Sequence, residues 1–176
     1  MKTYIVGSVA SGKTTLARKI SDKVGIQCTH LDGIIHIKDK SNKVWGNTRR
    51  TDEEINLLFS ELIEEPRWLI EDAGRKCFGA GMEKADTIIY LKPSKFIRTK
   101  RIITRYIKQK MGLEDCLYTP SLKMLKFMFW ALENYESGKD DLEARLEPYV
   151  HKTVTLKSNK EIKKFMLEEI VTYAKI

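Results

Sequence analysis

Short apolar runs alternate along the chain with longer stretches in which apolar residues recur at helical spacing. The apolar runs cover residues 3–6, 26–31, 67–70, 87–91 and 154–156. Each has the length of a strand, whereas the stretch 13–24 places Leu16, Ile20 and Val24 on one face of a helix. This alternation predicts a three-layer α/β fold in which helices cover a parallel sheet of five strands.

Capping and turn residues add further helices to this picture. Thr51 and Glu54 form a capping-box pattern that opens a helix ending near residue 64. The stretch 32–47 is rich in Gly, Lys, Asn and Asp, so we expect it to be mostly loop. The remaining helices are predicted over residues 94–110, 120–135 and 159–173.

The length and composition of the chain exclude several classes of protein. Its 176 residues suit one domain, spanning residues 1–176, and leave no room for a second. Its apolar runs fall far short of the roughly 20 residues that span a bilayer, so we expect no membrane partner and a cytoplasmic location. Cys28, Cys77 and Cys116 form no C-x-x-C pair, and we expect them to be free thiols.

A complete G-x-x-x-x-G-K-[ST] pattern joins the first predicted strand to the first predicted helix. It consists of Gly7, Ser8, Val9, Ala10, Ser11, Gly12, Lys13 and Thr14, and Thr15 follows on the helix. The backbone N–H groups of such a loop point inward at phosphate oxygens, and the helix N-terminus adds partial positive charge. Lys13 is expected to bridge the β- and γ-phosphates, and the Thr14 hydroxyl to ligate Mg²⁺. The pattern therefore predicts a P-loop that binds a nucleoside triphosphate with magnesium.

Acidic residues follow two of the predicted strands at the sheet edge that carries the P-loop. Glu71 and Asp72 follow the third apolar run, and either could orient magnesium-bound water as a Walker-B acid does. Asp32 follows the second run, where it could orient or deprotonate an acceptor hydroxyl or bind magnesium through water. A turn-capping role is the alternative for Asp32. His30 and His36 flank it without other metal-ligating residues, which favours structural or surface roles.

The helix predicted at 94–110 concentrates positive charge. Residues 92–110 hold eight Lys or Arg side chains and no acid. Four of these cations are spaced by three, four and three residues, which places them on one face of the helix. They are Arg98, Arg101, Arg105 and Lys108. Such a row could neutralise transferring phosphoryl oxygens, form a solvated face, or contact nucleic acid, and the formal net charge of +8 suits anionic partners.

In three segments the chain resembles the adenylate-kinase-like group of small P-loop kinases. The segments are the P-loop, residues 70–75 and residues 101–105. The group has a D-G-F-P-R segment at the strand end, so the resemblance puts Glu71 in place of its acid and Arg75 in place of its arginine. Arg101 and Arg105 match the two arginines of its R-I-x-G-R lid. The resemblance implies that these arginines hold phosphates and that one of them packs on the adenine.

A closer resemblance is to the bacterial DNA topology modulation protein (FlaR-like) family, and it extends over nearly the whole chain. It rests on Leu31-Asp32, residues 68–71, 84–91 and 97–105, and Leu156-Lys157-Ser158. It implies that the adenine lies beside the backbone of Lys157 and Ser158. Asp72 departs from the family pattern, in which glycine follows the strand-end glutamate. The family name suggests an effect on DNA, whereas the motifs indicate a kinase.

Two functions from different classes follow. The first is a kinase that uses ATP and Mg²⁺ to phosphorylate a nucleotide, nucleoside or other small acceptor, with ATP favoured over GTP because no N-K-x-D motif is present. The second is an ATP-binding regulator associated with DNA topology, which the basic run at 92–110 supports. For the kinase, the predicted catalytic residues are Lys13, Asp32, Arg101 and Arg105.

The acceptor of such a kinase is expected to lie between an insert at about 33–65 and Arg75. Arg49 and Arg50 could hold a phosphate of the acceptor with Asp32, or they could belong to a solvated turn. A helical lid at about 94–119 is expected to be mobile until nucleotide binds. The helix at 120–135 is apolar nearly all round, which suits core burial but leaves both a monomer and a homodimer open.

Overall fold

The computed structural model describes residues 1–39, 41–42, 45–116 and 118–168. Its centre is a sheet of five parallel strands, as the alternation of apolar runs predicts, in the order β2-β5-β1-β6-β7. The strands are β1 (Lys2–Gly7), β2 (Cys28–His30), β5 (Trp68–Asp72), β6 (Thr87–Leu91) and β7 (Thr153–Leu156). Because β1 is the central strand, the loop that follows it opens at the middle of the carboxyl edge.

The two faces of the sheet bury separate apolar clusters, and β1 alternates between them. Ile5 faces α1 (Lys13–Val24) and α8 (Asn159–Glu168), in a cluster that includes Leu16 and Phe165. Tyr4 and Val6 face the other layer, which contains most of the remaining core helices. These are α3 (Asp52–Glu64), α4 (Gly79–Lys84) and α7 (Leu142–Leu146), with the short 3₁₀ helices Lys76–Phe78 and Glu147–Lys152. The predicted three-layer α/β fold is confirmed.

The stretch predicted to be mostly loop contains regular structure instead. It forms a short helix, α2 (Leu31–Ile35), and an antiparallel hairpin of β3 (His36–Lys38) and β4 (Asn47–Arg49). Strand β2 ends at His30, so Asp32 lies in the first turn of α2 and not at the strand end. Each hairpin strand has only three residues, and both strands are largely exposed. Strands this short and exposed show no alternation of apolar and polar residues, so the sequence did not reveal them.

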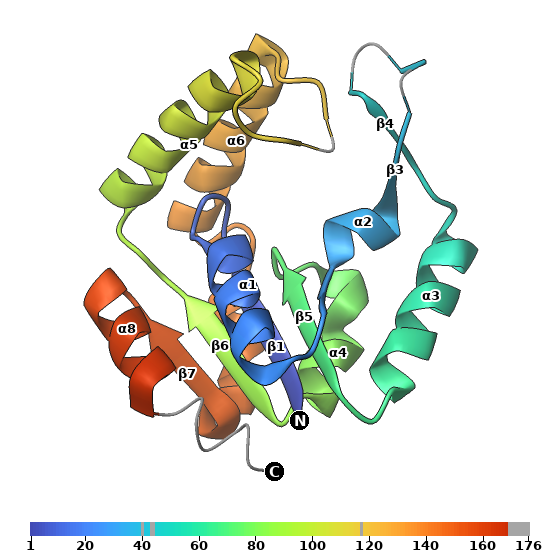
Figure 1. The fold of residues 1–176 in the computed structure, drawn as a ribbon, viewed down its shortest axis with the longest axis vertical. Helices are drawn as coiled ribbons and strands as arrows, with labels where there is room; N and C mark the ends of the chain where they lie inside the picture. Colours follow the sequence, from blue (N-terminus) through green and yellow to red (C-terminus); the bar gives the residue numbers. More distant parts are fainter. Residues whose placement is uncertain (40, 43–44, 117, 169–176) are drawn as a thin grey trace.

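Two long helices extend beyond the carboxyl edge of the sheet. They are α5 (Lys95–Lys110) and α6 (Leu122–Glu136), which pack against each other through Ile102, Met128 and Leu132. In Figure 1 this pair and the β3–β4 hairpin rise on opposite sides of the P-loop end of α1. The Ser121 side chain caps α6, so the helix begins after the predicted Pro120. Trp130 on α6 is 60% exposed, so that helix is not wholly buried.

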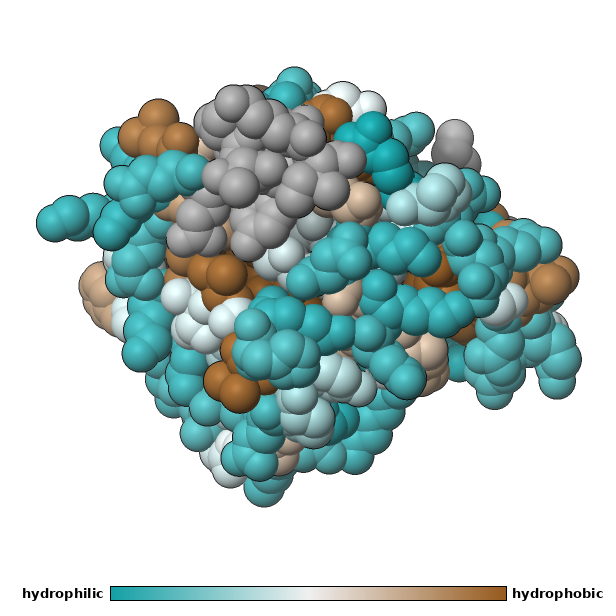
Figure 2. Space-filling model, turned by 90° about the horizontal axis from the view of Figure 1, so that it is seen from below, coloured by the Kyte–Doolittle hydropathy of each residue, from teal (hydrophilic) through white to brown (hydrophobic). Residues whose placement is uncertain are grey.

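The opposite end of the molecule carries the amino ends of the strands. Hydrophilic side chains cover most of the surface visible there, and hydrophobic ones form small separate groups between them (Figure 2). Among the helices that the structure describes, none is both long and apolar enough to cross a membrane.

Candidate nucleotide and acceptor site

The loop between β1 and α1 has the geometry of an anion cradle. Gly12 sits at the N-cap of α1 with φ of 103°, in the left-handed region, and makes no side-chain cap. A β-carbon at this position would be strained and would lie 3.1 Å from Arg101 Nη1. The first N–H groups of α1 therefore have no capping side chain, and an anion is the natural partner for them.

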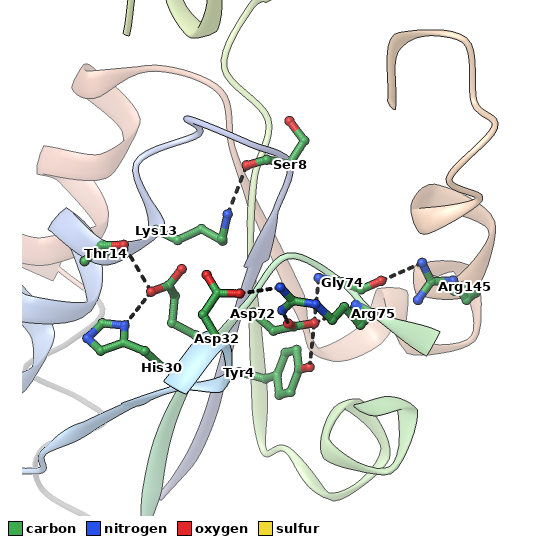
Figure 3. Close-up of polar contacts among 11 residues, drawn as sticks. Tyr4, Ser8, Lys13, Thr14, His30, Asp32, Asp72, Gly74, Arg75 and Arg145 are labelled. Atoms are coloured by element: carbon green, nitrogen blue, oxygen red, sulfur yellow. Dashed lines mark hydrogen bonds and ion pairs between the residues drawn. The ribbon is translucent and has the colours of Figure 1, made fainter. Parts of the chain in front are cut away.

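Two polar side chains buried in this loop also fit a phosphate ligand. Ser11 is 1% exposed, and within the described parts of the chain its hydroxyl has no hydrogen-bond partner. Lys13 is buried, and its ammonium donates to the Ser8 carbonyl over 3.0 Å (Figure 3). Burial lowers the pKa of Lys13 against the attraction of nearby carboxylates. A buried lysine and an unsatisfied hydroxyl are the groups that triphosphate oxygens would satisfy.

Glu71 is the acid that faces the predicted magnesium ligand. Its Oε2 accepts a hydrogen bond from Thr14 Oγ1 at 3.1 Å and lies 2.5 Å from His30 Nδ1. Burial alone would raise the pKa of Glu71, but the His30 hydrogen bond and the Lys13 charge outweigh it and lower that pKa. The same hydrogen bond raises the pKa of His30. The sequence left His30 without a partner because Glu71 lies 41 residues away.

Asp72 has a different environment from the one predicted for a magnesium ligand. Its carboxylate accepts bonds of 2.6 Å from the backbone N–H groups of Gly74 and Arg75, another of 2.6 Å from Arg75 Nη1, and one of 3.3 Å from the Tyr4 hydroxyl. Its side chain is 0% exposed. Successive residues of a strand point to opposite sides, so only Glu71 reaches Thr14. Asp72 instead orients the loop after β5 and the Arg75 side chain.

Asp32 and Arg75 form an ion pair beside the P-loop, as Figure 3 shows. Arg75 bridges Asp32 and the buried Asp72, so the bond to Asp72 holds its guanidinium in place next to Asp32. Protein groups around the Asp32 carboxyl partly desolvate it, which by itself would raise its pKa, but the charges of Arg75 and Lys13 outweigh this effect and lower the pKa. Asp32 is thus ionised and can accept a proton or a hydrogen bond. The structure brings together these two residues, which sequence reasoning assigned separately to the acceptor side.

Arg101 lies against the P-loop. Its Nη1 donates to the carbonyl of Ser11 at 2.6 Å and to that of Ala10 at 3.3 Å. A hollow opens beside it, between the P-loop and the start of α8. The residues that line it are Ser11, Leu91, Pro93, Ile97, Arg101, Leu156, Lys157, Ser158, Asn159 and Ile162. Lys157 and Ser158 thus lie beside the same hollow as the P-loop and Arg101.

The other arginines of α5 do not lie with Arg101 in one exposed row. Arg98 is 3% exposed and is paired with Glu136 on α6. Arg105 is partly exposed and lies 3.0 Å from Glu114. The run 92–110 contains no acid, but Arg98 still has an acidic partner, because Glu136 comes from the next helix.

Arg49 and Arg50, the two arginines that could hold an acceptor phosphate, bind different partners in the structure. Arg50 Nη1 donates to the carbonyls of Gly33 and Ile34, both at 2.7 Å, and so ties the base of the hairpin to α2. Arg49 pairs with Asp52 at 2.6 Å on an exposed surface. Neither makes a described bond to the Asp32–Arg75 pair, so Arg75 is the arginine that the structure joins to Asp32.

Comparison of the structure with solved structures reveals the same fold in several kinases. A gluconokinase from Sinorhizobium meliloti 1021 aligns with a TM-score of 0.56 at 15% identity, over 99% of this chain and 93% of its own. The shikimate kinase of Acinetobacter baumannii, solved with shikimate, gives 0.55 at 13% identity, over 97% and 93%. A sugar kinase from Janibacter sp. HTCC2649 gives 0.52 at 17% identity, over 99% and 94%.

No family model and no curated protein matches the sequence. At these identities the likeness establishes the architecture, and the site rests on the residues described above. The chain has the fold of the small-molecule P-loop kinases.

Proposed function

We propose that this protein is a small-molecule kinase that transfers the γ-phosphoryl group of Mg-ATP to a hydroxyl of a small acceptor. The observation that carries the proposal is the Asp32–Arg75 pair beside the P-loop. It offers an ionised carboxylate and a fixed cation on the acceptor side of a phosphate cradle. A simple nucleotide-binding module has no need of this pair.

On the nucleotide side, the N–H groups at the start of α1, with Lys13 and the Ser11 hydroxyl, hold the phosphates. Thr14 and Glu71, which are bonded to each other, would hold Mg²⁺, Glu71 through a water molecule. Mg-ATP supplies the phosphoryl group and neutralises part of its charge. The adenine occupies the hollow between Arg101 and the Lys157–Ser158 backbone, and Arg101 and Arg105 stabilise charge on the transferring group.

On the acceptor side, Asp32 orients the attacking hydroxyl and takes its proton as the new O–P bond forms and the bond from the γ-phosphorus to the leaving ADP breaks. Arg75 holds Asp32 in place and offers its remaining N–H donors to the acceptor. The neighbours named for gluconate, shikimate and sugars suggest hydroxylated sugars and sugar acids as acceptors. Nucleosides and nucleoside monophosphates are the other class to test.

Two measurements test the proposal. ADP release should rise when one acceptor from a panel of sugars, sugar acids, nucleosides and nucleoside monophosphates is added to the protein with Mg-ATP. Lys13→Ala should abolish nucleotide binding in calorimetry, because the buried lysine is the main cationic contact to the phosphates. Unchanged ATP affinity in Lys13→Ala would refute the nucleotide site.

The second function predicted from the sequence was an ATP-binding regulator associated with DNA topology. Its support was the basic run at 92–110, but Arg98 in that run is buried and Arg101 is bonded to the P-loop. These two cations face the protein and not a nucleic acid. Tight, steeply salt-dependent DNA binding with no acceptor-stimulated turnover would favour the regulator over the kinase.

A further inference from the structure

The P-loop has an outer side as well as a phosphate side. When successive N–H groups turn inward to an anion, neighbouring carbonyl and hydroxyl oxygens turn outward and need donors of their own. Here the donors come largely from α5, since Arg101 binds the carbonyls of Ala10 and Ser11. Helix α5 therefore supports the loop through oxygens that do not face the phosphates.

Arg98 makes the deepest of these outer contacts. Its Nη1 donates to the Ser8 hydroxyl, and Ser8 is itself 5% exposed. The carbonyl of the same serine accepts from Lys13 at 3.0 Å. Ser8 is thus held on its side chain by α5 and on its backbone by the lysine that is predicted to bind phosphate.

The surroundings of Arg98 keep its guanidinium in one position. Its Nη2 pairs with Glu136, and its Cζ lies 4.5 Å from the centroid of the Tyr135 ring. Both partners are on α6, 37 and 38 residues further along the chain. A buried charge is tolerated when it is paired in this way. The planar guanidinium of arginine also lets one residue bind two partners at a fixed angle.

Building on the proposed function, we propose that Arg98 is a positioning residue for nucleotide binding. It holds the Ser8 side of the P-loop in the shape that directs the loop N–H groups at the phosphates, while Glu136 and Tyr135 hold Arg98. Arg98 does not itself touch the nucleotide. This differs from the three roles that its spacing on α5 left open, which were a phosphoryl contact, a solvated face and a nucleic-acid contact.

A purely structural role for Arg98, as a link between α5 and α6, makes a different prediction. The chain offers a matched control, because Lys95 and Glu133 join the same two helices at 2.6 Å. Each lies three residues before its counterpart in the Arg98–Glu136 pair. The Lys95–Glu133 pair is largely exposed and has no described bond to the P-loop, so Lys95→Met breaks an α5–α6 link without touching Ser8.

The test compares Arg98→Met, Arg98→Lys, Ser8→Ala and Lys95→Met by ATP calorimetry, thermal unfolding and steady-state kinetics. Arg98→Met should weaken ATP binding about tenfold and raise the KM for ATP while leaving the KM for the acceptor unchanged. Arg98→Lys should recover only part of the affinity, because an ammonium cannot bind Ser8 and Glu136 as a fork. Lys95→Met should bind ATP as the wild type does.

Ser8→Ala decides whether the effect passes through Ser8, and it remains informative if Arg98→Met does not fold. It should weaken ATP binding by itself, and in the Arg98→Met background it should add little further loss. Fully additive losses, wild-type ATP affinity in either single variant, or an equal loss in Lys95→Met would overturn the inference. If the wild type binds ATP but phosphorylates no acceptor, the proposed function fails and the Arg98 inference can still be tested by binding.

Discussion

The nucleotide and acceptor sides of the site share one edge of the sheet but are built differently. On the nucleotide side the key groups are buried, and a rigid strand–loop–helix unit positions them: Ser8, Ser11 and Lys13 are at most 9% exposed. On the acceptor side, the Asp32 side chain is 61% exposed and that of Arg75 is 30% exposed. Asp32 is carried by a five-residue helix, not by a long element.

This difference has a physical consequence for substrate binding. In the proposed kinase, the triphosphate would be recognised by backbone groups that the local turn geometry fixes, so a short motif is enough to specify them. The acceptor would be recognised by side chains that reach each other across the fold, so their arrangement depends on partners far along the chain. Mutations on the two sides should therefore have different effects: some should change nucleotide affinity, others the rate of phosphoryl transfer, and others the stability of the protein.

The largest effect expected on the acceptor side comes from Asp32→Asn. It should lower kcat about a thousandfold, because the amide cannot take the proton of the acceptor hydroxyl, while ATP affinity changes little. Asp52→Asn is the control, since Asp52 also pairs with an arginine but lies on the exposed start of α3. Equal turnover in Asp32→Asn and the wild type would leave Asp32 only a structural partner of Arg75.

The pH profile of the wild type should report the same residue. Asp32 must be ionised to accept a proton, and the charges of Arg75 and Lys13 lower its pKa against the opposing effect of partial desolvation. The acid limb of kcat/KM should therefore lie below the range of an ordinary aspartate, with activity lost as the pH falls through the lowered pKa. An acid limb at or above the ordinary range would contradict this assignment.

Arg105→Ala should have the next largest effect, a loss of about a hundredfold in kcat with little change in ATP affinity. Arg105 is partly exposed beside Glu114, so it can move to the transferring phosphoryl group and stabilise its charge. Lys110→Ala, at the exposed end of the same helix, is the control for a general loss of positive charge. Unchanged turnover in Arg105→Ala would make this part of α5 a solvated face.

Asp72→Asn separates the two acids that the sequence left as equal magnesium ligands. It should lower the free energy of unfolding by about 2 kcal/mol, because a buried carboxylate that accepts from Tyr4, Gly74 and Arg75 loses its charge. The Mg²⁺ dependence of turnover should stay as in the wild type. Asp86→Asn, at an exposed carboxylate that accepts from the Lys2 N–H, should cost less than 1 kcal/mol. A shifted Mg²⁺ requirement with unchanged stability in Asp72→Asn would restore Asp72 as a ligand.

The smallest effect concerns the contact between the hairpin and the loop before α6. The carbonyl of Trp45 accepts from the Thr119 N–H at 2.8 Å, and Lys123 Nζ lies 4.7 Å from the centroid of the Trp45 ring. Gly46 has φ of 72°, and a β-carbon there would lie 2.9 Å from Thr119 N. Gly46→Ala should therefore push the loop away and speed hydrogen exchange at the Thr119 amide.

Gly138→Ala is the matched control for this change. Gly138 also has φ of 72°, but no atom lies within 4 Å of the β-carbon position, so it carries the backbone strain without the collision. Gly46→Ala should destabilise the protein by about 1 kcal/mol more than Gly138→Ala does. Equal destabilisation, with normal exchange at Thr119, would mean that the hairpin and the loop before α6 touch without restraining each other.

Local signals were sufficient for the elements that form the scaffold. The run 87–91 and the periodic stretch 13–24 coincide with β6 and α1, and the capping box of Thr51 and Glu54 is present in the structure. Each of these elements is decided by residues a few positions apart. The β3–β4 hairpin and α7 were missed because they are too short to show a period and depend on tertiary contacts.

The same distinction explains what was predicted of the site. The P-loop is a contiguous motif and could be recognised in the sequence. The choice between Glu71 and Asp72 could not be made, because the two are neighbours in sequence and differ only in the side of the strand to which each side chain points. Arg98 shows the limit most clearly. Its spacing on α5 fits a phosphate contact, but a glutamate 38 residues away and a buried serine 90 residues away hold it behind the loop.

The anchored base of the hairpin bears on how acceptor choice could be altered. The chain leaves α2 and returns through one point, where Arg50 N donates to the Ile35 carbonyl at 2.8 Å and the Arg50 guanidinium holds two further carbonyls of α2. A segment whose two ends are hydrogen-bonded to each other can be replaced by another segment, since its ends stay together whatever residues lie between them. Residues 36–49 are thus a grafting position at which a new recognition loop could be installed while the sheet and the P-loop keep their sequence.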